Sequence, residues 1–187
     1  MIGVDEVGRG CYAGPMLVVA ARVRKIYTIG LKDSKKLTRE EREDLFGDIV
    51  SKFDLGEGWV QHHEIDALGL TKATRLGVQR ALDGIKARTD EEIIIDGHIN
   101  YANSRVYRNS VCMIKADDKC KEVSAASIYA KVTRDRYMMN LAAKYPQYGF
   151  ETNVGYGTLH HRKAMEIHGL TDIHRRLFAP VKQMEIL

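Results

Sequence analysis

The sequence has little proline, no repeats and no long apolar run. Only three of its 187 residues are proline, and no low-complexity tract occurs, so nothing in the composition indicates disorder. The longest apolar run near the start, residues 16–21, is far shorter than the roughly 18 residues of a membrane-spanning helix. We therefore expect a single domain over residues 1–187 that does not contact a membrane.

Cysteine is also scarce. Cys11, Cys112 and Cys120 are widely spaced and form no CxxC pair. An odd number of unpaired thiols, with no secretory segment in view, is typical of a reduced protein in the cytoplasm. We accordingly expect a cytoplasmic protein, without disulfides and without a cysteine-based zinc site.

The excess of positive charge is small, at +4 from 29 basic and 25 acidic residues. Many soluble proteins are slightly basic, so net charge alone only hints at a polyanionic partner. The placement of the basic residues is more informative, because many of them surround the acidic segments described next. They are Lys32, Lys35, Lys36, Lys115, Lys119, Lys121, Lys131, Arg134 and Arg136.

The hydrophobic pattern predicts an α/β protein in which strands and helices combine into a mixed sheet covered by helices. Strands are expected at residues 1–8, 16–23, around 59–60, 92–96 and 111–114. Helices are expected at residues 38–52, 64–88, 119–144 and 158–168. A capping-box pattern from Thr38 to Glu41 opens the first helix, and Gly69 is expected to interrupt the second.

Acidic residues occupy positions where a purely structural role is costly. Asp5 and Glu6 are neighbours in an apolar strand, so one must face inward or the backbone must bend. The alternative is an edge strand with both acids solvated. Asp96 directly follows a run of isoleucines that reads as a buried strand, and strand ends of this kind hold ligands in open α/β sheets.

Two further acids, Asp117 and Asp118, lie between a strand and a long helix. Simple helix capping would explain them, but we expect Asp117 to face a site and Asp118 to face solvent. Oxygen ligands of this type favour Mg²⁺ or Mn²⁺, and two such ions can stabilise phosphoryl transfer once substrate is bound. Without an ion the clustered carboxylates would repel one another, and at least one pKa would rise. The expected metal and catalytic residues are Asp5, Glu6, Asp96 and Asp117.

Six ordered blocks of the sequence resemble the ribonuclease HII family. The blocks are residues 5–10 (DEVGRG) with 13–15 (AGP), 33–37 (DSKKL), 95–97 (IDG), 115–135 (KAD through SAASI and AKVTRD), 155–158 (GYGT), and 174–176 (HRR) through 180–181 (PV). The likeness covers nearly the whole chain, which makes it far more specific than any single block.

The resemblance implies a ribonuclease H-like fold with a five-stranded mixed sheet, flanking helices and a C-terminal helical part over roughly residues 145–187. It implies an endoribonuclease that acts on RNA/DNA hybrids and on single ribonucleotides in duplex DNA. Cleavage on the 5′ side of the ribonucleotide would leave 3′-hydroxyl and 5′-phosphate ends. Removal of misincorporated ribonucleotides and of RNA primers is the implied role.

The resemblance also implies residues that read the substrate. Gly8, Arg9 and Gly10 would contact the 2′-hydroxyl, the group that distinguishes RNA from DNA. Tyr156 would pack on the sugar of the following deoxynucleotide. Taken alone, these segments also fit an ordinary turn and a packed loop tyrosine.

Other polar residues of the blocks would contact phosphates or order the carboxylates. They are Lys35, Lys36, Lys119, Lys131 and Ser127. A solvated basic face explains any single lysine almost as well, and Ser127 also suits helix packing. The adjacent histidines at 62–63 and 160–161 are interpreted as surface or packing residues.

The chain departs from the family pattern at a few positions. Cys11-Tyr12 stands where Pro-Leu is usual, and Asn153-Val154 where His-Lys is usual, which removes one possible phosphate contact. Neither departure removes a carboxylate. The related ribonuclease HIII family usually has Gly-Lys-Gly at residues 8–10.

Two other functions remain open from the sequence. One is a nuclease of the same fold that cuts DNA, and the other is a nucleic-acid binding module without catalysis. Four retained carboxylates argue against the module, because they repel phosphate unless a metal is bound. A sliding-clamp-binding tail that begins at Gln183 is an interpretation to which we do not commit, and a monomer is the default expectation.

Overall fold

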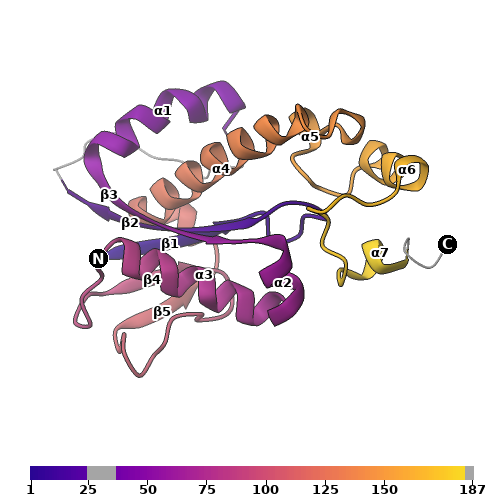
Figure 1. The fold of residues 1–187 in the computed structure, drawn as a ribbon. Helices are drawn as coiled ribbons and strands as arrows, with labels where there is room; N and C mark the ends of the chain where they lie inside the picture. The colour runs from indigo at the N-terminus through magenta and orange to yellow at the C-terminus, as the bar shows by residue number, and fades with distance from the viewer. Residues whose placement is uncertain (25–36, 184–187) are drawn as a thin grey trace.

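The computed structural model describes residues 1–24 and 37–183, and it is built around one five-stranded sheet (Figure 1). The strand order is β3-β2-β1-β4-β5. Strand β1 is antiparallel to β2 and parallel to β4, so the predicted five-stranded mixed sheet is confirmed. The strands are β1 Ile2–Val7, β2 Met16–Val23, β3 Phe53–Val60, β4 Ile93–Asp96 and β5 Ser110–Met113.

Helices cover both faces of the sheet. In Figure 1, α1 and α4 lie over one face, and α2 and α3 lie over the other. The longer helices are α1 Arg39–Lys52, α2 His62–Leu68, α3 Leu70–Gly84, α4 Lys121–Ala142 and α6 Leu159–His168. Shorter turns are η2 Ala116–Asp118, η3 Pro146–Tyr148, α5 Phe150–Asn153 and α7 Ala179–Lys182. The short turns were not predicted, because three or four residues are too few to show a helical period.

Local signals in the sequence set two helix boundaries. The Thr38 hydroxyl accepts a hydrogen bond from the Glu41 amide at 3.2 Å, and the Glu41 carboxylate accepts one from the Thr38 amide at 2.6 Å. The predicted capping box is therefore present and begins α1. Gly69 separates α2 from α3 with a φ of 72°, as expected.

Strand β3 is longer than predicted. It was expected only around residues 59–60, but it begins at Phe53, so Gly56 and Gly58 lie inside it. Helix α3 packs so closely there that a Cβ at Gly56 would collide with the Ala81 carbonyl, and one at Gly58 with the Gly77 carbonyl. These glycines therefore allow a close helix–strand approach and do not end the strand.

The core has a layer on each face of the sheet. Alternate residues of β2 supply both layers, since Met16, Val18 and Ala20 face α3 while Leu17, Val19 and Ala21 face α1 and α4. Burial on both faces explains why β1, β2 and β4 read as continuous apolar runs.

The last part of the chain forms a third apolar cluster at one end of the sheet, where Figure 1 shows α5, α6 and α7. This cluster packs on Ala13 and on Met138 of α4. Its other buried members are Tyr145, Tyr148, Phe150, Val154, Ala164, Met165, Ile173 and Val181. The C-terminal helical part is thus attached beside the turn that follows β1.

Some predicted features lie outside the described residues. They are Lys35, Lys36 and residues 184–187 of the possible clamp-binding tail. Within the described ranges, no helix combines the length and the apolar character needed to cross a bilayer.

Candidate active site

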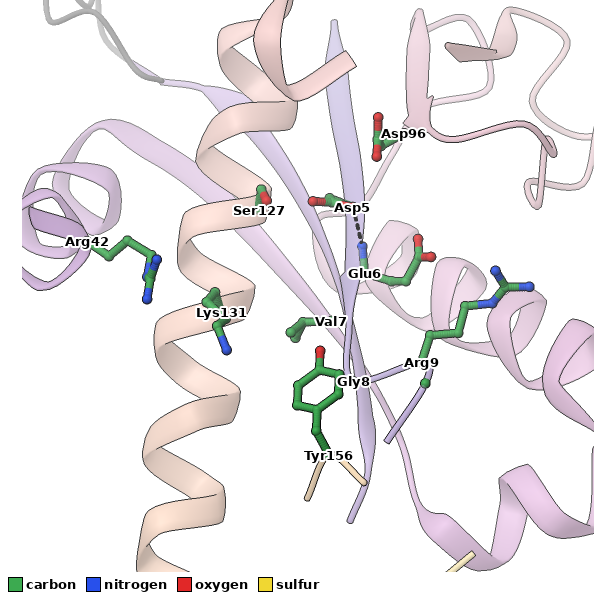
Figure 2. Close-up of a pocket in the computed structure, with 11 residues that line it drawn as sticks. Asp5, Glu6, Val7, Gly8, Arg9, Arg42, Asp96, Ser127, Lys131 and Tyr156 are labelled. Carbon is green, nitrogen blue, oxygen red and sulfur yellow. Dashed lines mark hydrogen bonds between the residues drawn. The ribbon is translucent and has the colours of Figure 1, made fainter. Parts of the chain in front are cut away.

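A cavity of about 270 Å³ opens beside the end of β1 (Figure 2). It brings together residues from β1, the turn after it, α1, β4, α4 and the loop before α6. The lining residues are Asp5, Glu6, Val7, Gly8, Arg9, Gly10, Arg42, Asp96, Ser127, Lys131 and Tyr156. Most residues that the sequence singled out therefore share one site.

The strand register explains why three carboxylates line one cavity. Val4 of β1 pairs with Ile95 of the parallel strand β4, so the next residues, Asp5 and Asp96, lie side by side. Figure 2 shows Asp5 and Glu6 pointing to opposite sides of β1, as neighbours in a strand must. Asp5 is only 8% exposed, because it points toward α4.

Fixed donors hold two of these carboxylates. The Asp5 carboxylate accepts a hydrogen bond from the Glu6 amide at 2.8 Å and another from the Ser127 hydroxyl. The Asp96 carboxylate accepts one from the Ala116 amide at 2.8 Å. Both groups are therefore oriented before any ligand binds.

Burial and like charge raise the pKa of Asp5 to about 8. Burial is the main cause, and the nearby Glu6 and Asp96 carboxylates add to it, while the hydrogen bond from Ser127 acts in the opposite direction. Without a bound cation, the Asp5 carboxyl is thus harder to ionise than an ordinary aspartate, through burial first and through the repulsion expected of clustered carboxylates second.

Asp117 is not among the residues that line this cavity. It is 4% exposed in η2, whereas Asp118 is exposed, so the two acids do differ in burial as predicted. The Ala116 amide connects this turn to Asp96. Among residues 1–24 and 37–183, however, no three Asp, Glu, His or Cys side chains are close enough to form a ready metal site. The role of Asp117 as a ligand therefore stays a prediction.

The donor set nevertheless suits a divalent cation. Asp5, Glu6 and Asp96 offer only oxygen atoms, which Mg²⁺ and Mn²⁺ prefer. A cation would also relieve the repulsion that raises the Asp5 pKa.

We predict that Mg²⁺ raises the melting temperature, and raises it more at pH 8.5 than at pH 6.5. In the unfolded chain the Asp5 carboxyl has its ordinary pKa of 3.8, and in the metal-free fold its pKa is about 8. Stability of the metal-free protein therefore falls as pH rises between these values, since ionisation then favours the unfolded chain. A bound cation stabilises the ionised Asp5 carboxylate and so offsets this loss of stability. Below pH 8 the cation must first displace the proton of the Asp5 carboxyl, so it stabilises the fold less.

Thermal melts with Mg²⁺ and with EDTA at both pH values test this prediction. The Asp118→Asn variant is the control and should behave like the parent, whereas Asp5→Asn should lose most of the pH dependence. The absence of any shift at saturating Mg²⁺ would contradict the metal site.

The turn at Gly8, Arg9 and Gly10 forms one wall of the cavity. Gly8 has a φ of 79°, and the side chain of Arg134 fills the space where a Cβ would be, so only glycine is suitable there. Gly10 is different, because nothing lies within 4 Å of the position of its missing Cβ. The bare backbone at Gly10 is therefore open to a ligand.

Two buried arginines support this wall, and the sequence interpretation missed their role. Arg175 is fully buried and donates to the carbonyls of Gly8 at 2.6 Å, Arg9 at 2.9 Å and Gly14 at 3.0 Å. Burial lowers the pKa of Arg175 to about 10. Arg134, also fully buried, donates to the Pro15 carbonyl at 2.8 Å. Their positions within the family-like blocks were the only available signal.

The opposite wall contains Tyr156 and Lys131. The Lys131 ammonium lies 5.9 Å from the centre of the Tyr156 ring and pairs with Asp135 at 2.9 Å. The Tyr156 hydroxyl contacts the buried thiol of Cys11, and burial raises the pKa of both groups. Cys11, which stands where the family usually has proline, thus places a small polarisable side chain against the Tyr156 hydroxyl.

Other basic residues differ from expectation. Arg42 of α1 lines the cavity although it was not predicted, and its guanidinium also donates to the Leu37 carbonyl at 2.7 Å. Arg9 donates to the Tyr101 hydroxyl at 3.0 Å, which directs its side chain away from Asp5. Lys119 is exposed and reaches the Ile114 carbonyl at 3.5 Å, so it is not part of the cavity wall.

The chain is similar to known ribonucleases. The family model described as Ribonuclease HII matches residues 2–181. A ribonuclease HII of Pseudothermotoga lettingae is 41% identical, over 97% of this chain and 78% of the relative. A ribonuclease HII of Bacillus cereus is 42% identical, over 97% of this chain and 70% of the relative.

Solved structures show the same fold. Ribonuclease H2 from Pyrococcus horikoshii OT3 is 28% identical and superposes with a TM-score of 0.80, over 99% of this chain and 96% of that one. The Archaeoglobus fulgidus ribonuclease HII, solved in complex with PCNA, is 24% identical with a TM-score of 0.81, over 98% of this chain and 95% of that one.

Proposed function

The chain belongs to the ribonuclease HII family and is a ribonuclease H-type endonuclease, and we propose that it cuts on the 5′ side of ribonucleotides paired with DNA. The substrates would be RNA/DNA hybrids and single ribonucleotides in duplex DNA. The products would carry 3′-hydroxyl and 5′-phosphate ends, and the role would be ribonucleotide and primer removal. The supporting observation is one cavity that joins Asp5, Glu6 and Asp96 to the bare turn at Gly10 and to Tyr156.

We propose that Asp5, Glu6, Asp96 and Asp117 hold Mg²⁺ or Mn²⁺, with two ions present when substrate is bound. The bound metal would supply an activated water and would stabilise charge on the phosphate. The chain itself orients the ligands, since Ser127 holds Asp5 and the Ala116 amide holds Asp96.

Basic residues are proposed to hold the phosphates around this centre. Lys131 lines the cavity beside Tyr156, and Arg42 lines it from α1. For Lys35, Lys36 and Lys119 the proposal rests on the family resemblance alone. Each phosphate contact should steepen the salt dependence of binding.

Backbone contacts at the turn are proposed to read the 2′-hydroxyl. The Gly8 carbonyl already accepts from the Arg175 guanidinium at 2.6 Å and from the Cys11 amide at 3.3 Å, so both of its lone pairs are engaged. A ribose is better placed at Gly10, where nothing lies within 4 Å of the position of the missing Cβ. Reading through backbone makes recognition independent of the base.

A labelled DNA duplex with a single ribonucleotide tests the proposed function. It should be nicked on the 5′ side of the ribonucleotide with Mg²⁺ or Mn²⁺ and should stay intact with EDTA. An all-DNA duplex should survive, and equal cutting of it would instead support a DNA nuclease. Tight binding of both duplexes without any cutting would support a binding module.

We predict that Tyr156→Ala impairs cleavage at single ribonucleotides about ten- to a hundredfold more than cleavage of RNA/DNA hybrids. The ring is proposed to pack on a sugar that lacks a 2′-hydroxyl, and only the single-ribonucleotide substrate always presents such a sugar. Rates on both substrates measure the ratio. Tyr156→Phe is the matched control, because it keeps the ring and loses only the hydroxyl near Cys11. Equal losses on both substrates would refute the assigned role.

A further inference from the structure

Two buried histidines lie behind the cavity and are absent from its lining. His161 of α6 is 0% exposed, and His174 in the segment after α6 is 1% exposed. Their Nε2 atoms are 3.0 Å apart. The rings are packed among aromatic side chains, with the Phe150 ring centre 5.3 Å from that of His161 and the Tyr148 ring centre 5.2 Å from that of His174.

Hydrogen bonds at the outer nitrogens assign the tautomers. The Thr171 amide can only donate, and it lies 2.9 Å from Nδ1 of His174, so that nitrogen is an acceptor. His174 therefore carries its proton on Nε2 and donates it to Nε2 of His161. His161 must then carry its proton on Nδ1, which lies 2.9 Å from the Tyr156 carbonyl.

Both rings are neutral in this arrangement. Burial lowers the pKa of His161, and burial together with the neighbouring His161 lowers the pKa of His174 to about 3. A further proton on His161 would place two N–H groups against each other between the Nε2 atoms, and a further proton on His174 would place an N–H at Nδ1 against the Thr171 amide. The pair is therefore a directed chain of hydrogen bonds from Thr171 to the Tyr156 backbone.

The same segment also holds the opposite wall of the cavity. Arg175 follows His174, and its guanidinium binds the carbonyls of Gly8 and Arg9. The backbone of this segment is bonded to the turn as well, since the Arg175 amide donates to the Tyr12 carbonyl at 2.8 Å. Two consecutive side chains thus support the two elements that are proposed to read the substrate. His174 is connected to Tyr156 through His161, and Arg175 binds the turn at Gly8 and Arg9.

We propose that His174, acting through His161, positions Tyr156 relative to the turn at Gly8–Gly10 and so determines specificity for single ribonucleotides. This inference rests on the proposed function and assigns it a positioning residue outside the cavity. The Tyr156 carbonyl also accepts from the Thr158 amide at 2.8 Å, so losing the relay shifts the loop without unfolding it. The spacing between the two walls is then set by residues 171–175.

The test compares His174→Phe with His174→Gln. Phenylalanine fills the aromatic cluster without a donor, whereas the glutamine amide can still donate near the position of Nε2. His174→Phe should lower the ratio of single-ribonucleotide to hybrid cleavage about three- to tenfold, the range that one lost hydrogen bond produces. His174→Gln should restore most of the ratio. In a Tyr156→Ala background, His174→Phe should leave the ratio unchanged.

A control separates positioning from stability. Met165→Ala removes a buried side chain from the same cluster, so it should lower the melting temperature and leave the substrate ratio at the parent value. A parent-like ratio for folded His174→Phe would overturn the proposal. If the parent enzyme cuts no ribonucleotide substrate at all, the proposed function itself is wrong. That outcome differs from a parent-like ratio in His174→Phe, which refutes only the positioning role.

The tautomers give a readout that depends on no variant. Long-range ¹H–¹⁵N correlation spectra of the parent protein, with labelled histidine, should show His161 protonated at Nδ1 and His174 protonated at Nε2. If both rings are protonated at Nε2, or if either is doubly protonated at pH 7, the relay does not exist. If His174→Phe does not fold, His161→Phe is the second variant, because it interrupts the same series of hydrogen bonds at its middle.

Discussion

Replacing Asp5 by asparagine is expected to lower the cleavage rate by about a thousandfold or more, with substrate binding largely retained. The Asp5 carboxylate points toward Ser127 and is near enough to Glu6 and Asp96 to be affected by their charges. An amide keeps the shape and can still accept hydrogen bonds from the Glu6 amide and from Ser127. The amide removes the negative charge that would hold a cation, so the variant should lose turnover and keep substrate binding.

The same variant should make the metal-free protein more stable. Asparagine is neutral at every pH and escapes the burial and repulsion that raise the Asp5 pKa to about 8. A gain in melting temperature together with a loss of activity is expected where a functional group is held in an unfavourable environment.

Single-turnover cleavage and gel-shift binding of Asp5→Asn measure the two parts of this prediction. Asp96→Asn should give the same pattern, and the exposed Asp118→Asn should act as the active control. Parent-like turnover of Asp5→Asn in both Mg²⁺ and Mn²⁺ would refute the catalytic role of the cluster.

Replacing Arg175 by methionine is expected to lower the free energy of unfolding by about 3–5 kcal/mol. The carbonyls of Gly8, Arg9 and Gly14 would lose a buried charged donor, and methionine offers no replacement. For a chain of this size, the corresponding fall in melting temperature is about 6–20 °C.

Urea denaturation and thermal melts of Arg175→Met check this value. The matched control is Arg176→Met at the neighbouring exposed position, where a change of at most about 0.5 kcal/mol is expected. Arg175→Lys should fall between the two, because an ammonium keeps the charge but cannot span three carbonyls. A loss below about 1 kcal/mol for Arg175→Met would show that water can replace the guanidinium.

The sequence was informative wherever a residue's role follows from its own strand or turn. Asp5 was recognised within an apolar strand and Asp96 at the carboxyl end of another, and the parallel pairing of these strands places the two residues side by side. The capping box at Thr38 and the break at Gly69 are equally local. Such signals need no knowledge of distant contacts.

Residues whose role depends on distant contacts could not be predicted. Gly56 and Gly58 resemble a boundary until α3 is known to pack on them. Arg175 and His174 resemble surface residues until the chain brings them under the turn after β1. Asp117 was expected to face the site, and its burial in η2, away from the cavity lining, depends on the path from β5 into η2.

The contact between Arg175 and Arg9 spans 166 residues, and it bears on how the enzyme is made. During translation Asp5 and the turn at Gly8 emerge early, while the guanidinium that binds this turn is synthesised much later. A nascent chain that ends before residue 171 contains all four carboxylates proposed for catalysis but neither His174 nor Arg175. The growing polypeptide therefore cannot complete the proposed substrate-reading surface before residue 175 has been synthesised.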